Sequence, residues 1–149
     1  MNPRTAVLID RTVGPVVYRL HRWMYRMTGG LLGQSSSVGP MLLLTTIGRR
    51  SGQPRIVPLL YMEDGGRFVV VGSNGGRPAP PAWLLNLGAH PEAEVQVGRL
   101  HYRVQAEVLH GDARGDLWDR LGRFYSGWAH YQTLTDRSIP VVVLTPVRS

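Results

Sequence analysis

Residues 41–73 read MLLLTTIGRRSGQPRIVPLLYMEDGGRFVVVGS, and this stretch decides the fold. It contains segments of β-type composition at 41–46, 55–62 and 67–73. The residues between the second and third segments, Glu63 to Gly66, are turn formers that tolerate positive φ. We therefore predict that the second and third segments pair as a hairpin.

The β pattern continues toward the C-terminus. Residues 93–97 and 100–109 flank Gly98-Arg99 and predict another hairpin, and residues 139–144 predict a last, fully buried strand. The six predicted strands are linked by hairpins and do not alternate with helices in βαβ units. This order favours a mainly β fold, a mostly antiparallel sheet or barrel with peripheral helices.

Two helices are predicted between these strands. Residues 82–89 form a short helix that His90-Pro91 closes, and Asp112 can cap a helix that runs to about Tyr125. The buried side of the second helix is predicted to carry Leu117, Leu121 and Phe124.

Upstream of the strands, Pro15 to Met27 has apolar residues at helical spacing and arginines on another face, which predicts a basic amphipathic helix. Such a helix packs on its domain, or covers a ligand or an anionic lipid surface. We expect one domain over residues 1–149, with residues 1–29 as an N-terminal amphipathic helical segment and residues 41–149 as the barrel with its helices.

Composition excludes several classes of protein. There are no cysteines, so disulfides, thiolate nucleophiles and zinc-thiolate sites are absent. The hydrophobic fraction of 43% argues against disorder, no apolar run approaches a membrane span, and the N-terminus does not resemble a signal peptide. We therefore expect a cytoplasmic protein, peripheral at the inner face of the cell membrane if the basic helix binds lipid.

Positive charge is concentrated in the first third of the chain. Residues 1–55 contain 8 arginines and the single acid Asp10, whereas residues 56–149 contain 9 arginines and 9 acids. The net charge of +7 therefore lies before residue 56. This asymmetry predicts an anionic partner for that region, such as a phosphorylated ligand, a lipid headgroup or a nucleic acid.

The sharpest local motif is Gly48-Arg49-Arg50-Ser51-Gly52-Gln53-Pro54-Arg55, between two predicted strands. Three guanidinium groups and several backbone N–H donors converge there, and glycine allows an oxyanion to approach the backbone. The motif is typical of a phosphate site, although an ordinary basic hairpin loop has the same composition. It lacks the lysine of a Walker loop and the glycine spacing of a nucleophile elbow.

A second glycine-rich loop, Ser73-Asn74-Gly75-Gly76, follows the third predicted strand and leads through prolines to Trp83 and Asn86. No helix opens from these glycines, so the loop is not a dinucleotide fingerprint. It is either a simple bend at a strand end or a place where a flat ring system lies against the backbone.

Aromatic residues form a third cluster. Tyr125, Trp128 and Tyr131 stand at i, i+3 and i+6 and would share a rough face of a helix. Such spacing is typical of a core stripe, and the two hydroxyls also suit the wall of a half-exposed pocket. The histidines show no pair at metal-ligand spacing and the carboxylates are scattered, so neither a metal site nor hydrolytic chemistry is expected.

Together these features resemble the deazaflavin-dependent nitroreductases, also described as F420H2-dependent quinone reductases. The similarity covers most of the chain and depends on the arginine loop together with the Trp-x-x-Asn-Leu segment. The similar stretches are Trp23 to Arg26, Leu42 to Arg55, Val69 to Gly76, Pro81 to Leu87 with His90-Pro91, and Tyr131 to Pro140.

The resemblance implies a split β-barrel of the FMN-binding type that holds the deazaflavin coenzyme F-420 (F420) in a groove. The phosphate and acidic tail would lie near the first motif and the ring near the second. The implied cofactor-binding residues are Arg49, Arg50, Ser51, Gly52, Gln53 and Arg55 for the tail, and Pro58, Ser73, Asn74, Gly75, Gly76, Trp83 and Asn86 for the ring.

The same resemblance implies that Tyr125, Trp128 and Tyr131 face the ring and an apolar acceptor such as a quinone, an enone or a nitroaromatic. Trp128 stands where the nitroreductase type carries tyrosine, and Leu60 occupies another pocket position. A deazaflavin carries a hydride, so the protein needs no triad, metal or thiol, and Tyr125 or Tyr131 could donate a proton to the reduced acceptor.

Three alternatives remain at this stage. The first is a split-barrel reductase that uses FMN, which lacks the glutamate tail and would need fewer arginines. The second is a nucleic-acid-binding module, which the separation of aromatic from basic residues disfavours. The third is a cofactor-binding or membrane-associated protein without turnover.

Overall fold

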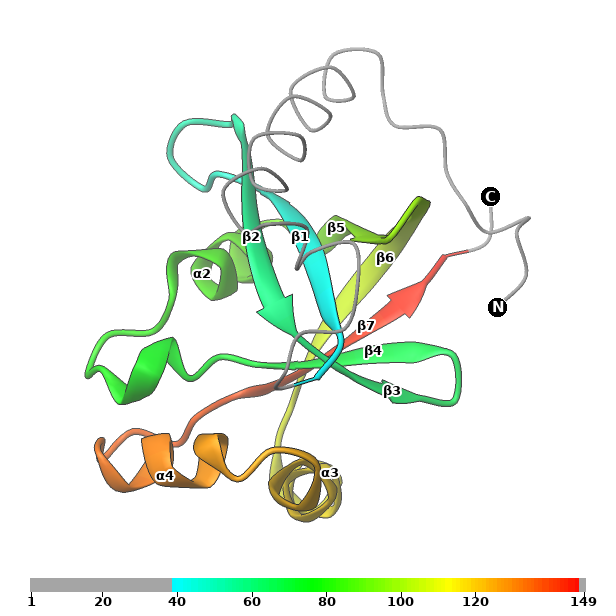
Figure 1. The fold of residues 1–149 in the computed structure, drawn as a ribbon. Coiled ribbons are helices and arrows are strands. Elements are labelled where there is room, and N and C mark those ends of the chain that lie inside the picture. Colours follow the sequence, from blue (N-terminus) through cyan, green and yellow to red (C-terminus); the bar gives the residue numbers. More distant parts are fainter. Residues whose placement is uncertain (1–38, 148–149) are drawn as a thin grey trace.

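The computed structural model describes residues 39–147 of the chain (Figure 1). These residues form one antiparallel sheet with the strand order β2-β1-β5-β6-β7-β4-β3. The strands are β1 (Met41–Ile47), β2 (Pro54–Leu60), β3 (Met62–Asp64), β4 (Arg67–Val71), β5 (Glu92–Val97), β6 (Leu100–Leu109) and β7 (Val141–Pro146). The helical elements are the 3-10 turn η3 (Asn74–Gly76), α2 (Ala82–Ala89), α3 (Gly111–Phe124) and α4 (Gly127–Thr133). The prediction of a mainly β, antiparallel fold with peripheral helices is confirmed.

The segment predicted as one strand over 55–62 is divided at Tyr61. Its first part, β2, pairs with β1 along its whole length, from Met41 opposite Leu60 to Ile47 opposite Pro54. Only its last residue, Met62, lies in β3, which forms a hairpin with β4. The prediction of a long 55–62/67–73 hairpin is therefore wrong beyond its tip, and the sheet has seven strands where six were predicted.

Proline explains where β2 lies. Pro54 and Pro58 have no backbone N–H, and prolines are tolerated in a sheet on an edge strand. β2 is such a strand, at one end of the strand order, and β3 is at the other end. Because β2 and β3 are consecutive in the chain, the sheet curls until its two edge strands meet at Tyr61, whose N–H donates to Pro40 at 3.1 Å (Figure 1).

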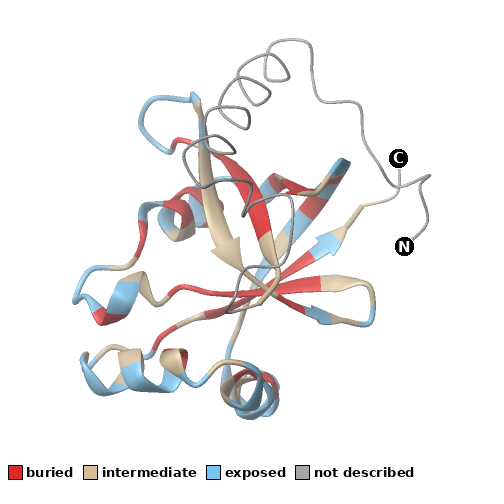
Figure 2. Ribbon diagram, in the orientation of Figure 1, coloured by how far each residue is buried: buried red, intermediate tan, exposed pale blue. Residues whose placement is uncertain are grey.

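The core lies on both faces of the curled sheet. Phe68 and Val70 of β4 belong to one cluster of buried side chains, with Trp83 of α2, and the alternating Val69 and Val71 belong to a second cluster. β7 alternates in the same way, so both strands are buried on both sides (Figure 2). The prediction of a fully buried last strand over 139–144 is confirmed for residues 141–144, although β7 begins two residues later than predicted and its last two residues are not buried.

Helix α2 has the predicted bounds, but α3 differs from its prediction in two details. It begins at Gly111 after His110, so Asp112 lies in its first turn, where a carboxylate favours the helix dipole, and does not cap the helix. Leu117 and Leu121 are buried as predicted, whereas Phe124 is 39% exposed because it ends the helix beyond the sheet.

Two elements carry the aromatic residues that the sequence placed on one helical face. Tyr125 is the residue that follows α3, whereas Trp128 and Tyr131 lie on α4. Gly127 lies so close to the Tyr125 ring that any side chain there would overlap it. The amphipathic helix predicted for residues 15–27 lies outside the described residues, so its contact with lipid stays a prediction. In the part of the chain that the structure describes, no helix is long and apolar enough to cross a membrane.

Candidate functional site

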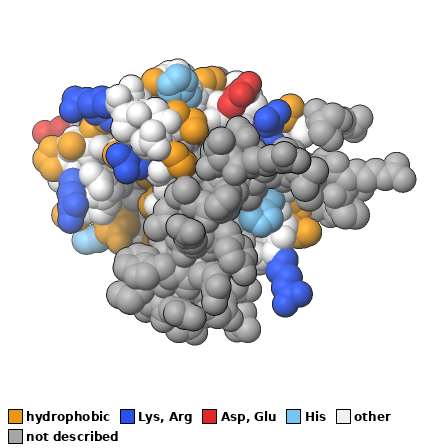
Figure 3. Space-filling view, turned by 90° about the horizontal axis from the view of Figure 1, so that it is seen from above, with side chains coloured by type: hydrophobic (Ala, Val, Ile, Leu, Met, Phe, Trp, Pro, Cys, Tyr) orange, Lys and Arg blue, Asp and Glu red, His pale blue; other side chains and the backbone are white. Residues whose placement is uncertain are grey.

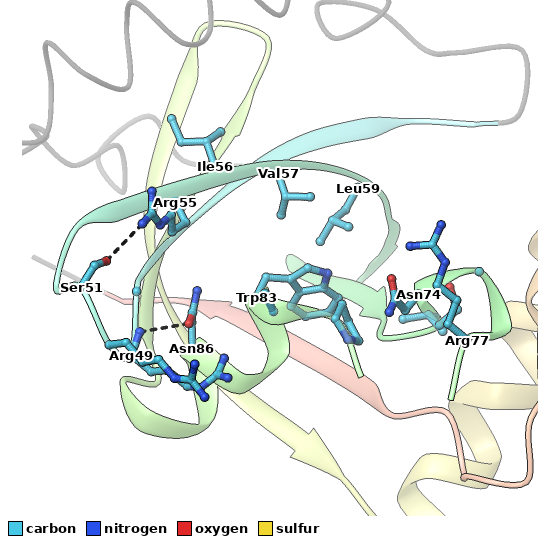
Figure 4. A pocket seen from close by; sticks show the side chains of 17 residues that line it. Arg49, Ser51, Arg55, Ile56, Val57, Leu59, Asn74, Arg77, Trp83 and Asn86 are labelled. Carbon is cyan, nitrogen blue, oxygen red and sulfur yellow. Dashed lines mark hydrogen bonds between the residues drawn. The ribbon is translucent and has the colours of Figure 1, made fainter. Parts of the chain in front are cut away.

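A cavity of about 940 Å³ opens between strand β2, the turn from β1 to β2, the loop after β4, and helix α2 (Figure 4). Both glycine-containing motifs meet there. The predicted cofactor residues that line it are Arg49, Arg50, Ser51, Arg55, Ser73, Asn74, Gly75, Trp83 and Asn86. Four other predicted residues adjoin the lining in the chain without contributing to it: Gly52, Gln53, Pro58 and Gly76.

The turn between β1 and β2 holds the arginines in place with backbone hydrogen bonds. The N–H of Gly48 donates to Gln53 at 2.8 Å, and the N–H of Gly52 donates to Gly48 at 2.8 Å. The Ser51 hydroxyl accepts from the N–H of Gln53 at 3.1 Å and from the Arg55 guanidinium at 3.4 Å. The turn is therefore a closed loop whose cationic side chains remain exposed.

Asn86 of α2 connects this turn to the core. Its buried side-chain carbonyl accepts the backbone N–H of Arg49 at 3.0 Å, and its amide donates to the Thr46 hydroxyl at 3.1 Å. A buried amide that is paired at both ends fixes the groups that it joins. Asn86 therefore fixes the arginine turn relative to α2.

Replacing Asn86 by leucine is expected to lower the free energy of unfolding by about 1–3 kcal/mol, because the Thr46 hydroxyl stays buried without its partner. The arginine turn also loses its anchor, so affinity for an anionic ligand of the cavity should fall with it. Urea denaturation and ligand titration measure the two effects.

Gln96→Leu is the matched control for this prediction. Gln96 is a buried amide that donates to the Gly98 carbonyl at 3.0 Å, and it does not line the cavity. The Gln96→Leu variant should be less stable than the wild type but should keep its affinity for an anionic ligand of the cavity. Equal affinity losses in the two variants would contradict an anchoring role for Asn86.

The loop after β4 has an unusual backbone. Asn74, Gly75 and Gly76 have φ values of +47°, +64° and +79°, a region that glycine enters freely and asparagine tolerates. The Asn74 amide donates to Ala79 at 2.9 Å. Gly75 has no neighbour near its missing side chain, so this part of the loop is open toward the cavity.

The cavity has an apolar middle between two basic ends. Trp83 is 7% exposed and lies opposite Val57 and Leu59 of β2 (Figure 4). The β1–β2 arginines lie at one end, and Arg77 lies at the other beside Asn74. Among the described residues that line the cavity there is no acid.

This layout suits an anionic ligand with a flat apolar portion. Viewed from above, arginines and hydrophobic side chains intermingle on the described surface (Figure 3). The lining also contains Ile56, Val57, Leu59 and Arg77, which were not predicted as site residues. Val57 and Leu59 are two residues apart, so they lie on the same face of a strand. Residues on the opposite face have the same spacing, so the sequence does not show which face lines the cavity.

Tyr125, Trp128 and Tyr131 come together in the second core cluster and do not line this cavity. Trp128 is 4% exposed, with the Tyr125 ring edge-on at 5.2 Å between centroids. A hydrogen bond with Tyr131 and burial raise the pKa of Tyr125 above its usual value, so this phenol keeps its proton at neutral pH. Helix α4 reaches the cavity wall through η3, where the Tyr131 carbonyl adjoins Gly76.

A family model described as F420H2-dependent quinone reductase matches residues 17–146. The chain belongs to this family. An F420H2-dependent quinone reductase of Mycobacterium tuberculosis (strain H37Rv) is 38% identical over 141 residues, which cover 92% of this chain and 95% of that protein. A putative F420H2-dependent quinone reductase of the same strain is 37% identical over 107 residues, covering 72% and 90% of the two chains.

Solved structures agree with the membership in the F420H2-dependent quinone reductase family. A structure described as an F420-H2 dependent reductase superposes with a TM-score of 0.65 at 40% identity and covers 70% of this chain and 93% of its own. The heme storage protein HutZ of Vibrio cholerae, at 14% identity and a TM-score of 0.52, covers 74% of this chain and 83% of its own and shares the fold alone.

Proposed function

We propose that this chain binds F420 in the cavity between β2 and α2 and uses its reduced form to reduce a quinone-type acceptor. The observation that carries the proposal is the division of the cavity into an arginine-rich end and an apolar middle. F420 has the same division, because its flat deazaflavin ring is joined to a phosphodiester and a glutamate tail.

The arginine turn fits the anionic portion. Arg49, Arg50 and Arg55 would hold the phosphate and the tail carboxylates, since guanidinium groups bind both in a bidentate manner. The absence of acids from the described lining means that no side chain there repels this charge. FMN has one phosphate and no glutamate tail, so it uses fewer of these groups.

The middle of the cavity fits the ring. Trp83, Val57 and Leu59 provide apolar contact, and the Ser73–Gly75 backbone, which carries small side chains, allows close approach. When bound, reduced F420 supplies a hydride. The chain itself need only orient the acceptor against the ring and exclude water, which requires neither a base nor a metal.

The curled sheet supports a further assignment. We infer that it is a split β-barrel, because its edge strands β2 and β3 are consecutive in the chain and one of the two core clusters takes side chains from every strand except β3. The acceptor is a quinone in this proposal, with enones and nitroaromatics as alternatives. Trp128 at the position of a nitroreductase tyrosine favours the quinone.

Titration of the protein with oxidised F420 and with FMN, followed by fluorescence at several salt concentrations, tests the cofactor. F420 should bind more tightly, and its affinity should fall more steeply with salt because more charged contacts are screened. Tighter binding of FMN would favour an FMN-dependent reductase. If F420H2 bound to the protein persisted in the presence of a soluble quinone, the chain would be a binding protein without turnover.

Tyr125 and Tyr131 are proposed to donate a hydrogen bond or a proton to the reduced acceptor, with Trp128 packed behind them. Their support is the contact of α4 with the cavity wall, where the Tyr131 carbonyl adjoins Gly76. The double replacement Tyr125→Phe with Tyr131→Phe should lower kcat by at least about tenfold and leave F420 affinity unchanged. Unchanged kcat would reject the role, and Tyr61→Phe, on the other core cluster, is the control.

A further inference from the structure

A single side chain closes the base of the loop that forms one end of the cavity. Arg137 follows α4, and its guanidinium donates to three backbone carbonyls that lie far back in the sequence, in the segment after β4. The acceptors are Gly72 at 3.2 Å, Ser73 at 2.8 Å and Arg77 at 3.1 Å.

These carbonyls bracket the loop. Gly72 and Ser73 are where the chain leaves β4, and Arg77 is where it leaves η3, so one planar guanidinium joins the two sides of the loop. A guanidinium presents its N–H donors in a rigid fork, which an ammonium group does not. The spacing of the loop ends is therefore set by the geometry of Arg137.

The loop needs such a constraint because its own residues leave its conformation weakly determined. Of the three successive residues with positive φ, Asn74 to Gly76, two are glycines, which adopt many backbone conformations and lose the most conformational freedom on folding. Ser73, Asn74, Gly75 and Arg77 all line the cavity. A change in the spacing of the loop ends would thus move a wall of the site.

Arg137 is itself held in position. The Gln132 amide donates to the Arg137 carbonyl at 2.7 Å, and the Gln132 carbonyl accepts the N–H of Ile139 at 2.9 Å. In residues 39–147 the ion pairs join Asp64 to Arg67 and Arg120, so the charge of Arg137 is directed at carbonyl oxygens and not at a carboxylate.

We propose that Arg137 is a positioning residue for the cavity, which shapes the Ser73–Arg77 wall without touching the ligand. This inference rests on the proposed function only for the identity of the ligand, F420. Without the guanidinium the wall should become mobile, and the ring should lose its fixed contact with the Ser73–Gly75 backbone.

The test compares Arg137→Met with Arg137→Lys and with Arg114→Met. Arg114 is the matched control, because its guanidinium donates twice to the Ile139 carbonyl, at 3.1 and 2.7 Å, and does not line the cavity. Arg137→Met should weaken F420 binding by about tenfold or more, through the loss of charge-assisted hydrogen bonds that fix the wall. Arg137→Lys should restore little of the affinity for F420. Arg114→Met should lower Tm and keep the wild-type affinity.

Wild-type affinity for F420 in Arg137→Met would overturn the proposal, as would equal losses of affinity in Arg137→Met and Arg114→Met. If Arg137→Met does not fold, Arg137→Lys decides the question by the same comparison. Failure of the wild-type protein to bind F420 would count against the proposed function instead. Hydrogen exchange at the amides of residues 74–77 then tests Arg137 without a ligand, since faster exchange in Arg137→Lys is expected and unchanged exchange would contradict it.

Discussion

The double charge reversal Arg49→Glu with Arg50→Glu is expected to abolish F420 binding. Each guanidinium that holds a phosphate or carboxylate contributes a charge-assisted hydrogen bond of about 1.5–3 kcal/mol, so the loss of two raises Kd at least about 100-fold. Glutamates at these positions add repulsion against the anionic tail. Fluorescence titration at low salt measures the effect.

The control for this reversal has the same net charge. Arg99→Glu with Arg103→Glu changes two exposed arginines of the β5–β6 hairpin, which do not line the cavity. Its affinity for F420 should stay within a small factor of the wild-type value. Retained tight binding in the Arg49/Arg50 variant, or an equal loss in both variants, would contradict the assignment of the β1–β2 turn to the coenzyme tail.

Gly76→Ala is expected to destabilise the protein by about 3 kcal/mol. Its φ of +79° is strained for any L side chain, and a Cβ atom would lie 2.8 Å from the Tyr131 carbonyl oxygen and 2.9 Å from the Leu134 Cβ. The first effect costs about 1–2 kcal/mol and the overlap about 1–3 kcal/mol, because the obstructing Tyr131 oxygen belongs to the backbone of α4. Urea denaturation gives the change in free energy.

Gly75→Ala separates the two contributions. Gly75 has a φ of +64°, and a methyl group added there would have no other atom within 4 Å, so only the backbone strain remains. A loss of about 1–2 kcal/mol is expected there. Equal destabilisation of the two alanine variants would contradict a steric cost at Gly76 beyond the backbone strain.

The elements of the fold were more predictable than their partners. Glycine, proline and alternation located the strands, and α2 has the predicted bounds because Pro81 and His90-Pro91 enclose it. The break at Tyr61 leaves no local signal, since residues 56–62 form a continuous run of apolar residues on both sides of it. β2 and β3 pair with different strands, and the prolines of β2 favour an edge of the sheet. That edge exists only once the whole sheet has formed.

The site was predictable where one residue type carries one kind of chemistry. Arginine density marked the β1–β2 turn, and glycines marked the loop after β4. The roles of Asn86 and Arg137 depend on hydrogen bonds between residues 37 to 65 positions apart, which spacing in the sequence does not reveal. The predicted aromatic face over 125–131 is divided because the backbone leaves the helical conformation at Tyr125, whose φ and ψ are −150° and 108°.

The passage of the chain through Tyr61 links the two edges of the curled sheet. The edge strand β2 leads through Tyr61 directly into the other edge strand, β3, so both edges of the sheet depend on one short segment. The arginine turn at the far end of β2 is thereby tied to the β3–β4 hairpin and to the strand that leads into the cavity loop. A loss of structure at Tyr61 would therefore affect the arginine turn and the cavity loop together, although one precedes Tyr61 in the chain and the other follows it.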